Sequence, residues 1–213
     1  MVTALANGAD AILPVAEISE ALDQRRQSPS VLLAGERNGF RIGADLTGRI
    51  EFDFGNSPRE FGPDKVRGRR LVMTTTNGTR ALRSCAGARE ILVGSFLNLS
   101  VVASALRQAS PSTLLLVCSG THDEVAYEDA LAAGALCDLL WSEFEGGHVT
   151  DSAQIARQIF RTAAGDLLKA VQCARNARRL SAIPELAGDI QFCLQRDQSS
   201  IVPRMGADGW VTI

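Results

Sequence analysis

The chain has 213 residues, of which 46% are hydrophobic and 22% are charged, and its net charge is −2. That composition is typical of a soluble globular protein, and the length suits a single domain with a sizeable core. No apolar run approaches the roughly 18 residues of a membrane span, and the net charge argues against a nucleic-acid binder.

The chain begins inside a helical pattern. Met1 to Gly8 reads as the last turns of a helix that ends in an Asn-Gly cap, but no N-cap or first turn precedes it. We therefore expect that a strand and the start of this helix are missing before Met1. Their loss would leave an apolar groove or an unpaired sheet edge exposed.

Two strands and one helix are predicted next. Asp10–Val15 and Val31–Ala34 read as short strands, and Glu17–Gln27 between them reads as an amphipathic helix. The second strand leads into a polar turn, Gly35–Gly39, and the following residues, 40–57, show little helical pattern.

The junction from Val72 to Arg80 is the most informative segment. An apolar run ends there in the threonines Thr74–Thr76, turns at Asn77-Gly78, and enters a helical pattern. A strand end that leads into the start of a helix suits an anion, because the first N–H groups of a helix lack partners. Hydroxyl and guanidinium groups can add hydrogen bonds to phosphate oxygens. The alternative is a Thr-rich strand that closes in an ordinary Asn-Gly turn.

Two later segments repeat this arrangement. Glu90–Gly94 and Thr113–Cys118 read as apolar strands, and each is followed by a polar junction, Ser95–Asn98 and Ser119–Glu124. Apolar runs that alternate with helices favour parallel strands buried on both faces. All three junctions are then expected along the carboxyl edge of one sheet, where open α/β sheets bind ligands.

The rest of the chain is predicted to be mainly helical. After a helix that ends near Gln108, helices are expected over about Tyr127–Phe144, Asp151–Gly165 and Leu167–Leu180. Two strand candidates close the chain, Ile201–Met205 and Trp210–Ile213.

The five cysteines and two histidines do not form a metal-binding pattern. The cysteines are odd in number and widely spaced, and no C-x-x-C pair occurs, so we expect reduced thiols. The N-terminus also lacks the basic region and cleavage site of a signal peptide, which favours the cytoplasm.

Charge is unevenly distributed along the chain. Between Glu36 and Glu90, arginine and lysine outnumber aspartate and glutamate. This stretch is either an ordinary solvated surface or a surface for a strongly anionic substrate.

Several catalytic motifs are absent. Glu124 stands where a cysteine phosphatase loop that starts at Cys118 would need an arginine, and Glu51–Gly55 lacks the first Asp and the Thr of a D-x-D-x-T motif. The chain has no G-x-S-x-G elbow, G-x-x-x-x-G-K-[ST] loop, H-E-x-x-H motif or G-x-G-x-x-G fingerprint. These absences leave carboxylates as the candidate chemistry.

Acidic side chains near the predicted sheet edge are candidate ligands for Mg²⁺. Proteins usually hold this ion through carboxylates together with phosphate and water. Two alternatives remain for the acids: those at a helix start complement its dipole, and Glu36 pairs with Arg37 in a turn. The candidates are Glu36, Asp53, Glu124, Glu128 and Asp129.

A series of short motifs runs in order along the whole chain: Ala4–Ala9, Gly35–Gly39, Asp53–Pro58, Thr74–Arg80, Gly94–Asn98, Cys118–Thr121, Glu128–Asp129 and Asp189–Cys193. The Asn-Ser-Pro and Thr-Asn-Gly-Thr strings are specific in combination. On these motifs the chain resembles the 2-phosphosulfolactate phosphatase family.

The resemblance implies an α/β fold, with three α/β/α layers and a mixed, largely parallel sheet in one phosphatase-like domain over residues 1–213. It also implies Mg²⁺-dependent hydrolysis of 2-phosphosulfolactate to 3-sulfolactate and phosphate, a step towards coenzyme M. The partner would be a small anionic phosphate ester. A homodimer is one assembly that the sequence allows.

Site residues follow from the motifs and the resemblance together. The catalytic residues, which would also hold Mg²⁺, are expected to be Glu36, Glu128 and Asp129. Arg80 would neutralise charge that develops during phosphoryl transfer, and Arg37 would bind the carboxylate or sulfonate of the substrate. The remaining expected substrate contacts are Asn56, Ser57, Thr75, Asn77, Gly78, Thr79, Ser95, Asn98 and Thr121.

Two features depart from the family pattern. Relatives usually carry an N-terminal strand and an Asp-x-x-Arg-Ala-(Thr/Ser)-(Thr/Ser) segment before the Ala-Asn-Gly helix end, and Gly43–Glu51 is longer than the usual turn. The departures leave two alternatives. One is a degenerate, non-catalytic anion-binding paralogue, and the other is a phosphatase of the same fold with a different phosphate ester substrate.

Overall fold

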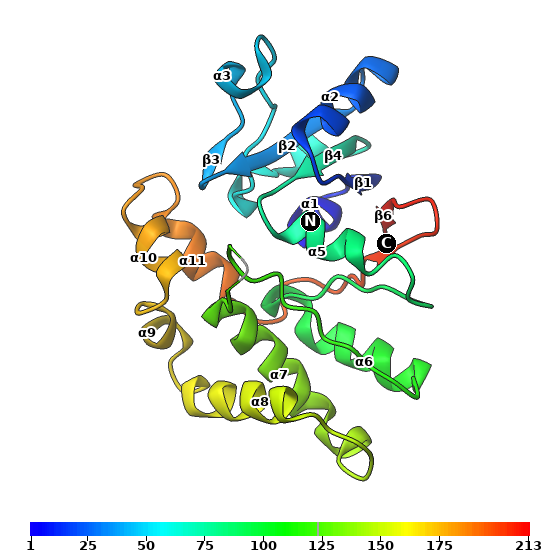
Figure 1. Cartoon of the computed structure of the whole chain (residues 1–213), viewed down its shortest axis with the longest axis vertical. Coiled ribbons are helices and arrows are strands. Elements are labelled where there is room, and N and C mark those ends of the chain that lie inside the picture. The colour runs from blue at the N-terminus through cyan, green and yellow to red at the C-terminus, as the bar shows by residue number, and fades with distance from the viewer. Residues whose placement is uncertain (123) are drawn as a thin grey trace. The chain divides into compact units, whose positions relative to one another are not determined.

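The structure, a computed structural model, describes residues 1–122 and 124–213 (Figure 1). These residues form two compact units: unit 1 comprises Met1–Val93 with Pro203–Ile213, and unit 2 comprises Gly94–Val202. Asp123, which belongs to the predicted junction Ser119–Glu124, lies outside the described residues.

Unit 1 is built on a six-stranded mixed sheet with the order β3-β2-β4-β1-β6-β5. The strands are β1 (Ala11–Pro14), β2 (Leu32–Arg37), β3 (Phe40–Arg41), β4 (Arg70–Thr74), β5 (Arg204–Met205) and β6 (Val211–Thr212). The helices are α1 (Val2–Ala6), α2 (Ile18–Gln27), α3 (Ala44–Thr47), η1 (Pro58–Glu60), α4 (Pro63–Val66) and α5 (Gly78–Ser84). The predicted α/β class and mixed sheet with parallel pairs are confirmed.

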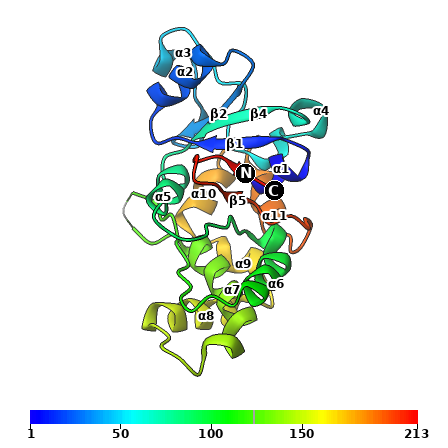
Figure 2. The same ribbon diagram turned by 90° about the vertical axis from the view of Figure 1, so that its right-hand side faces the viewer.

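The central strands β2, β4 and β1 are parallel and buried on both faces. Successive side chains of a strand point to opposite faces, and both Leu71 and Val72 of β4 are fully buried. Val72 belongs to a core cluster with Leu33 of β2 and Ala21 of α2. In both views of the ribbon, α2 lies on one side of these strands and α1 on the other (Figures 1 and 2).

The register of the parallel strands places three chain segments at one edge of the sheet. Pro14 pairs with Met73, and Gly35 pairs with Thr74. The ends of β1 and β4 and the last residues of β2 therefore lie together at the carboxyl edge of the sheet. The strand-to-helix junction predicted at Thr74–Arg80 is confirmed, because β4 ends at Thr74 and α5 begins at Gly78.

Two of the predicted strands are wrong. Thr113–Cys118 belongs to no strand in the described part of the chain, and Leu115 and Val117 are 79% and 48% exposed. Glu90–Gly94 is not a parallel strand, because its only bridge joins Leu92 to Arg204 in antiparallel orientation. An apolar run indicates a tendency to be buried but does not specify a partner strand. The three polar junctions therefore do not share one sheet edge.

Unit 2 contains only helices as regular elements of its described residues. They are η2 (Phe96–Asn98), α6 (Leu99–Ala109), α7 (Tyr127–Phe144), α8 (Asp151–Ala163), α9 (Leu167–Val171), α10 (Arg175–Ser181) and α11 (Ala187–Cys193). Helix α7 has the predicted bounds, whereas the single helix expected over Leu167–Leu180 is divided into α9 and α10. Across the residues that the structure describes, no helix has the length and apolarity needed to cross a membrane.

Candidate active site

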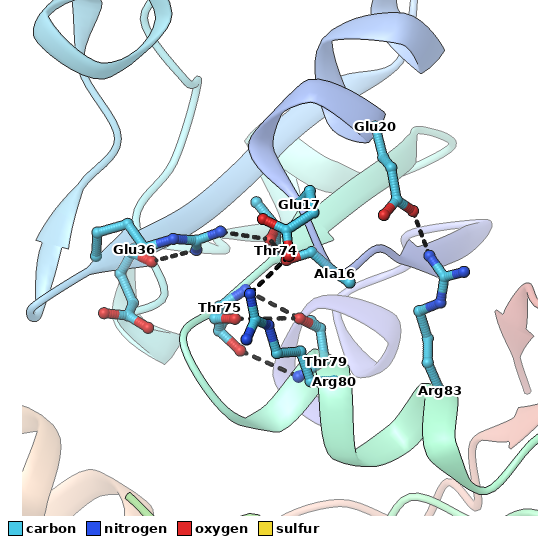
Figure 3. Close-up of polar contacts among 10 residues, drawn as sticks. Ala16, Glu17, Glu20, Glu36, Thr74, Thr75, Thr79, Arg80 and Arg83 are labelled. Carbon is cyan, nitrogen blue, oxygen red and sulfur yellow. Dashed lines mark hydrogen bonds and ion pairs between the residues drawn. The ribbon is translucent and has the colours of Figure 1, made fainter. Parts of the chain in front are cut away.

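The loop between β4 and α5 is closed by reciprocal hydrogen bonds between two threonines. The backbone N–H of Thr75 donates to Oγ1 of Thr79 over 3.1 Å, and the backbone N–H of Thr79 donates to Oγ1 of Thr75 over 3.1 Å (Figure 3). Thr79 is 1% exposed. Both hydroxyls therefore hold the loop in shape, and their direct contact with substrate stays a prediction from the sequence.

Glu36 fixes the same loop from the end of β2. It is 6% exposed, and its two carboxylate oxygens accept from the backbone N–H groups of Thr76 (2.8 Å) and Gly39 (2.9 Å). The side chain therefore ties the β4–α5 loop to the β2–β3 turn. Because both oxygens are already engaged, this position suits a residue that orders the loop better than a metal ligand.

Arg37 connects the three central strands at their carboxyl edge. Its Nη2 donates to Oγ1 of Thr74 over 3.0 Å, and that hydroxyl donates to the carbonyl of Ala16, which follows β1. Burial lowers the pKa of Arg37, while the carboxylates of Glu36 and Glu17 raise it. The guanidinium stays charged at neutral pH and supplies positive charge to this edge.

The rest of the loop and the start of α5 carry further polar groups. The Oγ1 atom of Thr76 is buried and has no hydrogen-bond partner among the described residues. The side chain of Asn77 does not cap α5. Arg80 forms an ion pair with Glu17, with 2.6 Å between Nη2 and Oε1. An unpaired buried hydroxyl costs free energy, so a ligand oxygen at this loop would be favourable.

Asn56 and Ser57 reach the same edge from another segment. Phe54 forms a parallel bridge with Ala34 of β2, so the two residues that follow Gly55 leave the sheet near the end of β2. Asn56 is exposed, whereas Ser57 is 5% exposed. The structure thus brings together the sequence-predicted residues of unit 1.

A second group of predicted residues surrounds the start of α7 in unit 2. Nδ2 of Asn176 donates to Oγ1 of Thr121 over 2.8 Å and to Oε1 of Glu128 over 2.5 Å. Arg175 donates to the carbonyl of Thr121 and pairs with Glu124. A pocket of about 360 Å³ opens beside these groups, and Glu128, Arg175 and Asn176 line it.

Sequence reasoning missed Arg175 and Asn176. They are 54 and 55 residues from Thr121 along the chain, and they lie in a stretch that reads as an ordinary basic helix surface. No local pattern marks them, because their role depends on a contact between distant segments.

Asp129 lies beside Glu128 but is held differently. One of its oxygens, Oδ2, accepts from the Ser119 hydroxyl (3.0 Å) and from the backbone N–H of Gly120 (2.9 Å). Burial is the largest effect and raises the pKa of Asp129, while these two hydrogen bonds lower it. The carboxyl group therefore orders the turn before α7.

Ser95 and Asn98 have a structural role. They form a capping box at η2, in which Oδ1 of Asn98 accepts from the backbone N–H of Ser95 over 2.9 Å. Asn98 is fully buried, and its Nδ2 donates to the carbonyl of Ile201. These contacts close the 3-10 turn, and the predicted contact of the two side chains with substrate stays a prediction.

Mg²⁺ fits the two carboxylates of α7 better than it fits Glu36. No group of three or more His, Cys, Asp or Glu side chains converges to hold an ion among the described residues. Proteins, however, often bind Mg²⁺ through one or two carboxylates, with substrate phosphate and water as the other ligands. Glu128 and Asp129 each have one oxygen in the hydrogen bonds described above, which leaves the other for an ion.

Comparison with known proteins identifies relatives along nearly the whole chain. A family model described as 2-phosphosulpholactate phosphatase matches residues 1–208. A probable 2-phosphosulfolactate phosphatase of Caldanaerobacter subterraneus is 36% identical over 207 residues, which cover 95% of this chain and 81% of the relative. A protein of the same description from Pseudothermotoga lettingae is 37% identical over 212 residues, which cover 99% and 86%.

Proposed function

Because the chain belongs to the 2-phosphosulpholactate phosphatase family and is thus a phosphoric monoester hydrolase, we propose that it hydrolyses 2-phosphosulfolactate to 3-sulfolactate and inorganic phosphate. The proposal includes similar small anionic 2-hydroxy acid phosphates. The observation that carries it is the carboxyl edge of unit 1, where Arg37 donates to Thr74 just before the β4–α5 loop and Arg80 follows the loop in α5.

The β4–α5 loop is the proposed phosphate site. The Thr75–Thr79 hydrogen bonds and the carboxylate of Glu36 fix the loop before substrate arrives. A preorganised loop loses little conformational freedom on binding an anion. The N–H groups of Thr75, Thr76 and Thr79 already donate within the protein, so the N–H groups of Asn77 and Gly78, with the Thr76 hydroxyl, would bind the phosphate oxygens.

Two guanidinium groups supply the charge that the reaction needs. During hydrolysis the oxygen of a water molecule bonds to phosphorus, the ester P–O bond breaks, and the leaving alkoxide takes up a proton. Arg80 neutralises charge on the phosphoryl oxygens, and Arg37 binds the carboxylate or sulfonate of the acid. Asn56, which is exposed at the same edge, orients the substrate.

Mg²⁺ dependence is part of the proposal, with Glu128 and Asp129 as the protein ligands. When bound to these carboxylates, Mg²⁺ would lower the pKa of a bound water. Asn176 donates to Glu128 and so orients its carboxylate. We also propose a cytoplasmic location, which the five free thiols support.

A phosphate-release assay tests the proposed function. The purified chain is incubated with 2-phosphosulfolactate, 2-phospholactate and phosphoglycolate, with Mg²⁺ and with a chelator. We expect release from the first ester to be fastest and to depend on Mg²⁺. Preference for another ester would retain the phosphatase but change the substrate, and no release from any ester would favour a non-catalytic anion-binding protein.

Two variants test the metal ligands within the same assay. Glu128→Gln should raise the Mg²⁺ concentration at half-maximal rate, because an amide is a weaker ligand for a hard cation than a carboxylate. Glu124→Gln is the matched control, since this residue lies in the same pocket and pairs with Arg175. Equal Mg²⁺ requirements in the parent chain and Glu128→Gln would contradict the assignment.

A further inference from the structure

Helices α2 and α5 are joined by two similar ion pairs. Arg80 pairs with Glu17, and one turn further along both helices Arg83 pairs with Glu20 (Figure 3). In each case a glutamate near the start of α2 meets an arginine of α5. The two pairs resemble each other in chemistry and exposure, and they differ in what surrounds them.

The Glu17–Arg80 pair lies at the proposed phosphate site. Arg80 directly follows Thr79, which closes the β4–α5 loop, and Glu17 directly follows Ala16, whose carbonyl accepts from Thr74. The same Thr74 hydroxyl accepts from Arg37. Two carboxylates, Glu36 and Glu17, and two guanidinium groups therefore occupy the region beside the loop. The charges of Glu36, Glu17 and Arg80 all act on Arg37.

Exposure shows that the pair contributes little to folding. The side chains of Arg80 and Glu17 are 58% and 55% exposed. Ion pairs this exposed are weakened by solvent and by the entropy of ordering two long side chains. The carboxylate of Glu17 therefore matters more for the state of Arg80 than for the stability of the sheet.

We propose that Glu17 is a specificity-determining residue, which competes with the substrate for the guanidinium of Arg80 beside the β4–α5 loop. This inference rests on the proposed function of that loop. The Nη2 group of Arg80 donates to Glu17, so a ligand that binds this group must displace the single negative charge of Glu17. A phosphate dianion does so readily because it carries more charge, whereas a singly charged ester gains little.

The competition predicts a change in binding when Glu17 becomes neutral. Glu17→Gln keeps the size of the side chain but removes its charge, so inorganic phosphate should bind about two- to fivefold more tightly, which is the range for losing one exposed ion pair. The KM for a doubly charged phosphate ester should fall by a similar factor. The ratio between the affinity for this ester and the affinity for a singly charged phosphodiester inhibitor should become smaller in Glu17→Gln.

Glu20→Gln is the matched control, because it neutralises the other pair on the same two helices. Phosphate binding is measured by calorimetry on the parent chain, on both variants, and on Arg80→Gln with and without Glu17→Gln. We expect tighter binding only for Glu17→Gln, and no effect of that change once Arg80 is absent. A purely structural role would instead lower the melting temperature of both glutamate variants without separating their phosphate affinities.

Different results would contradict the role of Glu17 and the proposed phosphatase function. Calorimetry with inorganic phosphate does not depend on turnover, so it tests Glu17 even if no ester is hydrolysed. Unchanged or weaker phosphate binding by Glu17→Gln would overturn the role of Glu17 while leaving the phosphatase intact. An equal gain in Glu20→Gln would also overturn it, because the effect would then reflect overall charge.

Discussion

Glu36 is buried at the end of β2, and its carboxylate accepts one hydrogen bond from each of two loops. A buried carboxylate is costly unless its oxygens are paired, and here both partners are backbone N–H groups. The geometry gives this residue a part in holding the β4–α5 loop, which differs from the metal-binding role that the sequence suggested for it together with Glu128 and Asp129.

Glu36→Gln should destabilise unit 1 by about 1–3 kcal/mol, because the amide presents an NH₂ group to a backbone N–H that then loses its acceptor. Denaturant unfolding measures the effect. Glu51→Gln is the control, since Glu51 is exposed and its nearest pairing, to Arg41, is 3.8 Å long. A loss of stability no larger than that of Glu51→Gln would show that the two hydrogen bonds do not hold the loop.

The free energy of unfolding of unit 2 should depend on pH through Asp129. Burial raises its pKa in the folded chain above the ordinary value of 3.8, so the folded state binds its proton more readily than the unfolded state does. Stability should therefore fall as pH rises from about 3.8 through the raised folded pKa, by at most about 1.4 kcal/mol per pH unit for one group. Asp129→Asn should flatten this part of the curve of unfolding free energy against pH. Identical curves for the two proteins would mean that the carboxyl group is not desolvated in the fold.

At the scale of residues, the sequence predicts correctly those positions whose structure depends on a short contiguous motif. Thr74–Arg80 combines a strand end, an Asn-Gly turn and a helix start, and the structure places these elements as expected. Glu17 and Asn176 could not be identified in this way. Their contacts join positions 63 and 48 residues apart, and each residue type is common on helix surfaces.

At the scale of elements, prediction succeeded where periodicity and neighbouring turns agreed. Helix α7 has a long apolar pattern with acids at its start, and the structure reproduces its predicted bounds. Thr113–Cys118 has an equally strong apolar pattern but belongs to no strand in the described part of the chain. Strand formation depends on a partner elsewhere in the sequence, whereas a helix satisfies its own backbone hydrogen bonds.

The contact between α7 and α8 depends on one glycine. A Cβ atom at Gly134 would lie 2.0 Å from the carbonyl oxygen of Ala156 and 2.8 Å from Cβ of Phe160. Glycine lowers intrinsic helix stability by about 1 kcal/mol relative to alanine. The close approach of the two helices therefore outweighs helix propensity at this position.

Gly134→Ala should destabilise unit 2 by about 1–3 kcal/mol, because the added methyl forces the two helices apart. Gly87→Ala is the control, since a Cβ there would meet no atom within 4 Å. Thermal melts of both variants measure the difference. If Gly134→Ala raised the melting temperature, intrinsic propensity would dominate and α7 and α8 could not pack as closely as the structure shows.

At the scale of the whole molecule, unit 2 is an insertion within unit 1. The chain leaves unit 1 after Val93 and re-enters it at Pro203, and the backbone N–H of Val93 donates to the carbonyl of Pro203 over 2.9 Å. The two crossing points are thus adjacent within unit 1. The sheet is completed by β5 and β6 from the returning segment, and all six strands belong to this unit.

This topology predicts that unit 1 folds without unit 2. Replacing residues 94–202 by a few glycine and serine residues bridges the short distance between the crossing points, and the product keeps the buried sheet core in a chain of ordinary domain size. We expect a cooperative thermal transition and binding of inorganic phosphate within about tenfold of the full chain, because that change of about 1.4 kcal/mol allows for a slightly looser loop. Ester hydrolysis should be lost together with Glu128 and Asp129.

The same shortened chain with Leu33→Asp is the control. It should not melt cooperatively, since Leu33 is fully buried between neighbouring strands. A shortened chain that is unfolded without this substitution would show that the sheet requires unit 2, and a folded one that does not bind phosphate would move the anion site away from the β4–α5 loop.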